Sequence, residues 1–341
     1  MDIAFIKSTP HIATASGVKI QALEWKTGLE KQGHNITLIN CWENIDWARF
    51  DILLFFEYDG YLRQFIELTK NLKAKIALAP IIDANATNFQ FKLACKFLGC
   101  EKLRLRSKFH DLYIIRNCID MYYVRSEYEK KYITKSLGIK DNKVTIVPLS
   151  YRIIPSKENI LKENFCFHLS RPADKGKNVP RLIKAAKKYN IPLIIAGGVK
   201  DDNERNWLMS LISDAPNIKY VGYLNEQDLY SYYKKAKVFA LPSIYEGVGM
   251  AALEAAVLGC EIVITKLGGP KEYFNNMAEI VNPYDIDEIG ESISKLLNNN
   301  KSYQPQLSDY IINHYNTDTC ISILNSSLRK IMNCKLPKLA Y

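Results

Sequence analysis

The sequence lacks the features that mark several large classes of protein. Its eight cysteines are scattered, with no CxxC pair and no histidines at a matching spacing. We therefore expect neither a disulfide framework nor a zinc site, and reduced cysteines of a cytoplasmic protein are the default interpretation. No apolar run approaches the roughly 20 residues that span a bilayer. The first residues, MDIAFIKSTPH, lead directly into a short apolar strand, so we expect no signal peptide.

Negative charge is also in deficit. Lys and Arg number 46 against 36 Asp and Glu, which gives a formal net charge of +10. Between residues 89 and 110 the cations alternate with Phe and Leu. This mixture fits an amphipathic segment on an anionic membrane surface, and it fits equally a groove for a polyanionic acceptor or a solvated basic face. No nucleic-acid motif accompanies it, so we expect no nucleic-acid partner.

The chain has 341 residues and a hydrophobic content of 48%, which is enough for two globular domains with substantial cores. Unbroken apolar runs, at 2–6, 36–39, 51–55 and 75–79, alternate with helical segments in the first part. This alternation predicts a parallel sheet covered on both faces, and thus an α/β fold. The loop after the first strand contains Gly17 alone and no GxGxxG, so the dinucleotide fingerprint is absent.

The most informative stretch is PSIYEGVGMAALEAAVLGCEIVITKLGGP, residues 242–270. It predicts the end of a strand, a glycine loop, a helix from Met250 to Leu258, and a second strand. The free N–H groups and the positive dipole end at the start of this helix suit a phosphate. Two carboxylates flank the helix start, Glu246 in the loop and Glu254 two turns further on. An ionised carboxylate only accepts hydrogen bonds, so it suits the hydroxyl groups of a sugar or a ribose.

The pattern PSxxEGxGxxxLEAxxxG, with Glu246 and Glu254 separated by seven residues, resembles the donor site of retaining glycosyltransferases of the GT-B fold, in particular glycosyltransferase family 4. The resemblance implies two Rossmann-like α/β domains that face each other across a cleft. It implies transfer of a sugar from a nucleotide sugar to a hydroxyl acceptor, with retention of configuration. A UDP- or GDP-sugar is the expected donor, with no tightly bound cofactor and no metal. Val248 departs from the family, which usually has Phe there.

The same resemblance gives the donor-site residues their expected roles. Glu246 would contact the transferred sugar together with Gly247, Val248 and Gly249, and Glu254 would hold the ribose. The nucleotide base would contact Tyr223 or Leu224, which follow Gly222.

The diphosphate needs cations, and SRPADKG at residues 170–176 is similar to the family's GRxxxxKG element, shortened by one residue. Arg171 offers a guanidinium fork and Lys175 a point charge. Lys177 is the alternative to Lys175 if the shorter loop shifts the register of this element. Met250 and Gly17 are expected to contribute backbone groups to the same diphosphate.

The acceptor side is less well defined by the resemblance. Many relatives have a His after the fourth strand that faces the sugar, and here Asp83 follows Ile82 instead. The expected acceptor-side residues are therefore Asp83, His110 and His11.

The resemblance also predicts the organisation of the chain. We expect an N-terminal acceptor-side domain at 1–150, a linker at 151–163, a nucleotide-sugar-binding domain at 164–308, and a helix at 309–341 that returns towards the N-terminal domain. The expected acceptor is a saccharide or lipid-linked saccharide in bacterial surface polysaccharide or glycolipid assembly. The protein would be cytoplasmic, with segment 89–110 on the inner face of the membrane. Two alternatives stay open, namely a GT-B sugar-nucleotide epimerase and a non-catalytic scaffold that binds a sugar nucleotide.

Overall fold

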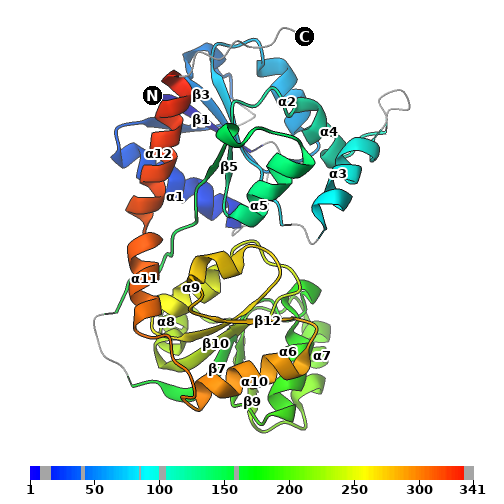
Figure 1. The fold of residues 1–341 in the computed structure, drawn as a ribbon, viewed down its shortest axis with the longest axis vertical. Coiled ribbons are helices and arrows are strands. Elements are labelled where there is room, and N and C mark those ends of the chain that lie inside the picture. The colour runs from blue at the N-terminus through cyan, green and yellow to red at the C-terminus, as the bar shows by residue number, and fades with distance from the viewer. Residues whose placement is uncertain (8–16, 40–42, 84–85, 100–104, 157–160, 334–341) are drawn as a thin grey trace. The chain divides into compact units, whose positions relative to one another are not determined.

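The computed structural model describes residues 1–7, 17–39, 43–83, 86–99, 105–156 and 161–333. His11 and residues 100–104 of the basic segment lie outside these ranges. The chain forms two compact units. Unit 1 contains Met1–Ile82, Ala86–Leu149 and Thr317–Tyr341, and unit 2 contains Asp83–Asn85 and Ser150–Asn316. Figure 1 follows the chain through both units by colour.

Unit 1 is built on a six-stranded sheet with the order β2-β1-β3-β4-β5-β6, and its strand pairs are parallel. The central strand β3 is buried along its whole length, because its uninterrupted apolar sequence ILLFF faces helices on both sides. The strands are β1 (Asp2–Lys7), β2 (Asn35–Leu38), β3 (Ile52–Phe56), β4 (Lys75–Ala79), β5 (Met121–Val124) and β6 (Val144–Ile146).

The helices of unit 1 come from both ends of the chain. The last helix packs against the first, and its apolar residues share a core cluster with Trp25 and Leu29. The expected continuous tail helix is therefore two helices, one in each unit. The helices of unit 1 are α1 (Gly17–Lys31), α2 (Leu62–Thr69), α3 (Asn88–Phe97), α4 (Lys108–Ile115), α5 (Glu127–Lys131), a π-helical turn η3 (Tyr132–Ser136) and α12 (Thr317–Asn333), with short 3-10 turns η1 (Trp47–Arg49) and η4 (Asp141–Lys143).

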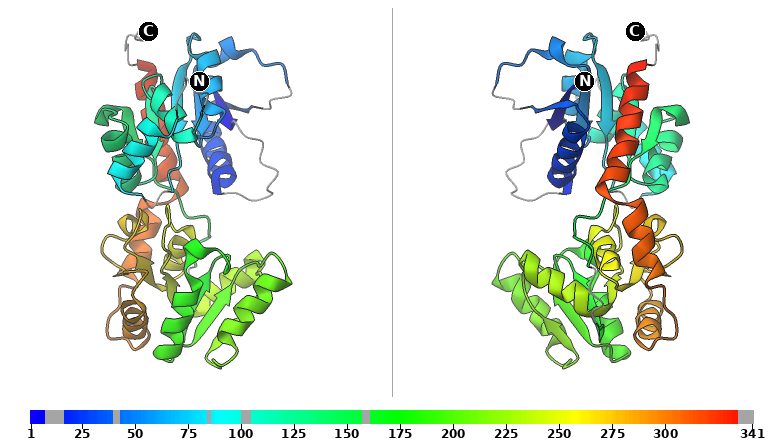
Figure 2. Two further views of the ribbon diagram at one scale, coloured as in Figure 1. Left: turned by 90° about the vertical axis from the view of Figure 1, so that its right-hand side faces the viewer. Right: turned by 90° about the vertical axis from the view of Figure 1, so that its left-hand side faces the viewer.

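Unit 2 repeats this architecture with the strand order β12-β11-β10-β7-β8-β9, again with parallel pairs. Figure 2 shows its sheet between layers of helices. The strands are β7 (Glu163–Leu169), β8 (Leu193–Ala196), β9 (Ile218–Tyr220), β10 (Ala236–Leu241), β11 (Glu261–Thr265) and β12 (Glu279–Val281). The helices are α6 (Val179–Lys188), α7 (Asp202–Ile212), α8 (Glu226–Lys235), α9 (Met250–Val257), α10 (Ile286–Leu297) and α11 (Gln306–His314), with 3-10 turns η5 (Lys175–Lys177) and η6 (Pro270–Phe274).

The order of strands in unit 2 decides which loops become neighbours. Strands β7 and β10 lie side by side at the centre of the sheet, and β11 follows β10. The loops at the carboxyl ends of parallel strands gather at one edge of the sheet, where such folds bind ligands. The segments after β7, β10 and β11 therefore meet, although about 70 residues separate the first two in the sequence.

Along the described ranges of the chain, no helix is both long enough and apolar enough to cross a membrane.

Candidate functional site

Hydrogen bonds join the loop after β7 to the loop after β10. The backbone N–H of Ile244 donates to the carbonyl of Gly176 at 2.8 Å. The side-chain amide of Asn178 donates to the carbonyls of Pro242 and Pro283, at 2.9 and 2.6 Å. The two loops therefore form one tied surface at the carboxyl edge of the sheet.

A carboxylate and an ammonium group face each other on this surface. The Nζ atom of Lys177 lies 2.6 Å from Oε2 of Glu246, and the hydroxyl of Ser243 donates to the same oxygen at 3.3 Å. The side chain of Glu246 is 15% exposed and that of Lys177 is 27% exposed. Because both charged groups reach solvent while holding each other in place, they can also meet a ligand from that side.

The loop after β11 closes against the same position. Gly268 has φ +82°, and a Cβ atom on it would lie 2.3 Å from the carbonyl oxygen of Glu246. A side chain at residue 268 would push the Glu246 loop away, so glycine is required here on steric as well as conformational grounds.

Helix α9 starts directly behind Glu246. Its N-cap, Gly249, has φ +76° and provides no side-chain hydrogen bond to the first turn. The N–H groups of that turn and the positive end of the helix dipole can therefore serve an anionic ligand. Val248 is 3% exposed and its side chain packs inward, whereas Gly247 and Met250 are half-buried.

Glu254 lies further along α9 and has a partner that the sequence did not reveal. Its carboxylate accepts from Nε of Arg152 at 3.0 Å and lies 2.8 Å from Nη2 of the same guanidinium. Burial raises the pKa of Glu254, and the charge and hydrogen bonds of Arg152 act in the opposite direction. Arg152 lies about 100 residues from Glu254 in the sequence, so no local spacing rule connects them.

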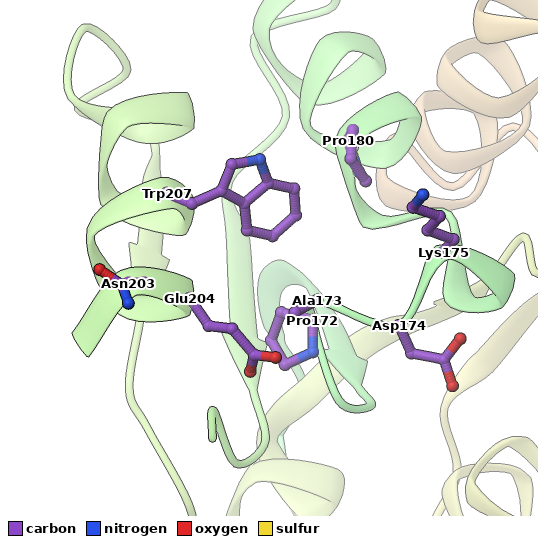
Figure 3. A pocket seen from close by; sticks show the side chains of 8 residues that line it. All are labelled: Pro172, Ala173, Asp174, Lys175, Pro180, Asn203, Glu204 and Trp207. Carbon is purple, nitrogen blue, oxygen red and sulfur yellow. The ribbon is translucent and has the colours of Figure 1, made fainter. Parts of the chain in front are cut away.

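The two cations expected for a diphosphate, Arg171 and Lys175, have different surroundings from Lys177. The side chain of Arg171 is 81% exposed and pairs with Asp174 at 3.3 Å. Lys175 lines an open cavity of about 370 Å³ that also contains Trp207 and Pro180, as Figure 3 shows. The residues at 175–177 form a 3-10 turn capped by Asp174. This turn directs Lys175 to the cavity. Lys177, the alternative candidate for the diphosphate, contacts Glu246 instead.

A buried histidine supports the start of the first loop. His168 is fully buried, with Nδ1 at 2.7 Å from the carbonyl of Ala240 and Nε2 at 2.7 Å from the hydroxyl of Ser170. Burial, and secondarily the charge of Lys177, lowers its pKa to about 4. The imidazole is therefore neutral near pH 7. Because its Nδ1–H donates to the carbonyl, Nε2 accepts from Ser170 and fixes the residue that precedes Arg171. The sequence pattern of this strand did not predict such a role for His168.

The expected base-binding residues follow β9 at the same edge. Tyr223 is 82% exposed, and a Cβ atom on Gly198 would lie 3.9 Å from its ring. Leu224 is half-buried. Both residues are accessible to a planar ligand, and no contact in the structure assigns either of them to one.

In unit 1, the segment after β4 carries strain. Ile81 has φ +55°, which is an outlier for a β-branched residue. The buried carboxylate of Glu129 holds the next residue through the N–H of Ile82 at 2.5 Å, and it also binds Arg125 at 3.0 Å. Asp83 follows and is exposed.

The other expected acceptor-side residues lie on different elements. His110 lies inside α4, and its Nδ1 lies 3.2 Å from the carbonyl of Cys95 on α3, so it joins two helices. Gly17 is the first residue of α1 and has open space around it. His11 lies outside the described residues. Over the described ranges, no three His, Cys, Asp or Glu side chains are grouped to hold a metal ion.

The class of protein follows from these features. Two units, each with a six-stranded parallel sheet covered by helices, confirm the expected pair of Rossmann-like α/β domains. Residues 151–314, which make up nearly all of unit 2, match the family of glycosyl transferases group 1.

Individual proteins show the same likeness. The O-antigen chain mannosyltransferase B of Escherichia coli is 30% identical over 132 residues, which cover 36% of this chain and 34% of that protein. The chain spans less than half the length of the first three curated relatives that it matches.

Several solved structures match nearly the whole chain. Sucrose-phosphate synthase from Thermosynechococcus elongatus has a TM-score of 0.75 at 14% identity, with 97% of this chain and 98% of that one covered. Anabaena Alr3699/HepE in complex with UDP has a TM-score of 0.73 at 11% identity, with 97% and 100% covered. At such identities the likeness shows the fold, and it confirms the GT-B class expected from the sequence.

Proposed function

We propose that the protein is a retaining glycosyltransferase of the family 4 type, which moves a sugar from a nucleotide-sugar donor to a hydroxyl acceptor. One observation carries this proposal. The Glu246–Lys177 pair lies at the N-terminus of α9, on the tied loops of the group 1 domain. A hydroxyl-binding carboxylate, a phosphate-binding cation and a helix N-terminus are thus combined within one site.

Each group has a role in the chemistry. Glu246 binds hydroxyl groups of the donor sugar, and Glu254 binds the ribose. In the reaction, the bond between the anomeric carbon and the diphosphate oxygen breaks, and the electron pair leaves with the diphosphate. The acceptor oxygen forms the new bond to the anomeric carbon, and its proton passes to the departing diphosphate.

Charge on the departing diphosphate is stabilised by groups already in place. Lys177, Arg171 and the first N–H groups of α9 supply positive charge, so the reaction proceeds without a metal. We assign the diphosphate to Lys177 in place of Lys175, because Lys177 contacts Glu246.

The donor is a nucleoside-diphosphate sugar, with UDP and GDP as the candidate carriers. The binding of UDP by the similar Anabaena protein supports the first of these. We assign the donor to unit 2 and the acceptor to unit 1, with the segment that follows β4 and leads to Asp83 on the acceptor side. Tyr223 and Leu224 are the candidates for the base.

The acceptor is a saccharide or a lipid-linked saccharide of a bacterial surface polysaccharide or glycolipid. The relation to an O-antigen mannosyltransferase supports this class. An acceptor of this kind is presented at the cytoplasmic face of the cell membrane, and we place the protein there as a peripheral enzyme.

A thermal-shift screen against UDP, GDP, ADP and CMP, each with and without its common sugars, tests the donor site. A ligand that binds only the native state raises the melting temperature. We expect one nucleotide to raise it, and Glu254→Ala to remove that rise.

The screen and an assay of the products separate the alternatives. Failure of all four nucleotides to stabilise the chain would contradict the proposed donor site. A stabilising donor that is converted to its epimer without any acceptor would identify an epimerase, and a donor that stays unchanged with every acceptor would favour the scaffold.

A further inference from the structure

Helix α3 of unit 1 has an outer face that is unusual for a helix in contact with water. Phe89, Leu93 and Phe97 are 68%, 39% and 72% exposed. Their spacing of four residues puts them in one stripe along the helix. A contiguous group of exposed apolar side chains marks a surface that meets another apolar phase, unlike single exposed residues.

The opposite face of α3 fixes this orientation. Phe91 is 1% exposed and its ring lies 4.8 Å from the ring of Tyr132, 5.6 Å from that of Phe109 and 6.4 Å from that of Tyr58. Cys95, one turn further on, is fully buried. Because this aromatic cluster holds one side of α3 against the unit, the Phe89 stripe points outward.

Positive charge borders the stripe. Lys92 and Lys96 are exposed and lie on the same outer arc, which spans about 140° of the helix together with the three apolar residues. Neither lysine has a carboxylate partner among the described residues. The helix contains no Asp or Glu. The α3 outer face, consisting of Phe89, Lys92, Leu93, Lys96 and Phe97, is therefore both apolar and basic.

We propose that the α3 outer face docks on an anionic lipid bilayer, with its phenylalanines among the acyl-chain ends and its lysines at the headgroups. Helices that lie in a membrane interface combine these two features. A second copy of this chain fits less well, because pairing two such faces would bring lysines against lysines. A soluble polyanion would meet the lysines and leave the phenylalanines in water.

The position of α3 in the chain relates the proposed docking to the acceptor. The helix starts five residues after Asp83, beyond the carboxyl end of β4. Figure 1 shows α3 beside α4 at the margin of unit 1. This part of the inference rests on the proposed function: a lipid-linked acceptor would lie at headgroup level, near the segment that we assign to the acceptor.

Co-sedimentation of the full chain with vesicles tests the proposal. The probes are vesicles of phosphatidylglycerol and phosphatidylcholine, and vesicles of phosphatidylcholine alone. We expect binding to the anionic vesicles only, and weaker binding at about 0.5 M salt, where screening is strong. Phe89→Ser with Phe97→Ser should lower the partition coefficient about tenfold per residue, and Lys92→Gln with Lys96→Gln about fivefold per residue.

The chain offers matched controls within unit 1. Leu68→Ser changes a residue on α2 that is 80% exposed, and Lys131→Gln with Lys135→Gln removes two exposed lysines at the same spacing. Both controls should bind as the unchanged protein does. All of the altered residues are exposed, so each variant should keep its melting temperature and its nucleotide-induced shift.

Several results would overturn the proposal. These are the absence of binding to either kind of vesicle, equal binding to both, or anionic binding that both α3 variants retain. Loss of a concentration-dependent dimer in the phenylalanine variant would instead identify a second copy as the occupant. None of these measurements uses transferase activity, so failure of lipid binding is distinguishable from failure of the donor site, which the nucleotide screen reports.

Discussion

Two lysines two positions apart illustrate how single residues acquire their roles. Lys175 lines the cavity beside Trp207, and Lys177 contacts the carboxylate of Glu246. Both are partly or fully exposed cations in a basic protein, so charge alone does not separate them. The difference arises from the 3-10 turn and the cap at Asp174.

For the lysines, we predict opposite outcomes of the same substitution. Lys177→Met should weaken binding of the nucleoside diphosphate about tenfold to a hundredfold, since a hydrogen bond to a charged group contributes about 1.5–3 kcal/mol. Lys175→Met should change it less than about twofold. Isothermal titration calorimetry measures both. A larger loss of affinity in Lys175→Met than in Lys177→Met would instead indicate that Lys175 binds the diphosphate, as first expected from the sequence.

The Arg152–Glu254 pair leads to a prediction about pH. Burial raises the pKa of Glu254 and Arg152 opposes that rise, so removing the guanidinium should raise the pKa further. Ribose binding uses the ionised carboxylate. In Arg152→Met, donor affinity should therefore fall at a higher pH than in the unchanged protein as the solution is acidified. Titrations with UDP between about pH 8 and pH 5 measure the shift. Parallel pH profiles would show that Arg152 does not tune Glu254.

At the scale of elements, His168 connects two strands and a loop. It lies on β7, binds the carbonyl of Ala240 on β10, and binds Ser170 at the start of the site loop. The lowered pKa of about 4 means that the folded chain keeps this imidazole neutral. The unfolded chain binds a proton at the ordinary value of about 6.5.

The sign of the pH dependence follows from this difference. The unfolded state binds more protons below about pH 6.5, so stability falls as the pH drops from there to about 4, by about 3 kcal/mol in total. His168→Gln should show a flatter dependence of the melting temperature over this range, whatever its stability at pH 7. The exposed His314 on α11 provides the control, since His314→Gln should keep the slope. An unchanged slope in His168→Gln would contradict the assignment.

At the scale of the whole molecule, the chain builds two cores, and its last helix returns to the first. The last helix, α12, completes the core of unit 1, where Leu324 is fully buried. The core of unit 2 is a separate cluster that contains Leu182. A large-to-small change in either cluster leaves a cavity in one unit only.

Calorimetry of the variants should therefore resolve the two cores. Leu324→Ala should destabilise unit 1 by about 2–5 kcal/mol, and Leu182→Ala should destabilise unit 2 by a similar amount. The nucleotide that binds should raise the temperature of one unfolding transition only, the same transition whose temperature Leu182→Ala lowers. A single transition that both variants and the ligand move together would show that the units unfold as one.

The sequence by itself determined the fold class and the local structure around Glu246. Apolar runs of strand length, separated by helical segments, predicted parallel sheets, and the structure has two of them. The glycine loop and helix around Glu246 were predicted within a residue or two, because local propensity and capping act over a few neighbouring positions. Asn225 and Ser126 act over the same short range, since each caps a helix by accepting a hydrogen bond from the N–H three residues further on.

Only the tertiary structure decided which side chains meet. Arg152 reaches Glu254 and His168 reaches Ala240 across about 70 to 100 residues, because these segments come together only when the whole unit folds. The choice between Lys175 and Lys177 depended on a single turn of 3-10 helix. Phe91 and Phe89 were indistinguishable in the basic segment until the fold buried the first and exposed the second. Periodicity records which faces are apolar, whereas the packing of the whole unit determines which apolar face is left for a partner.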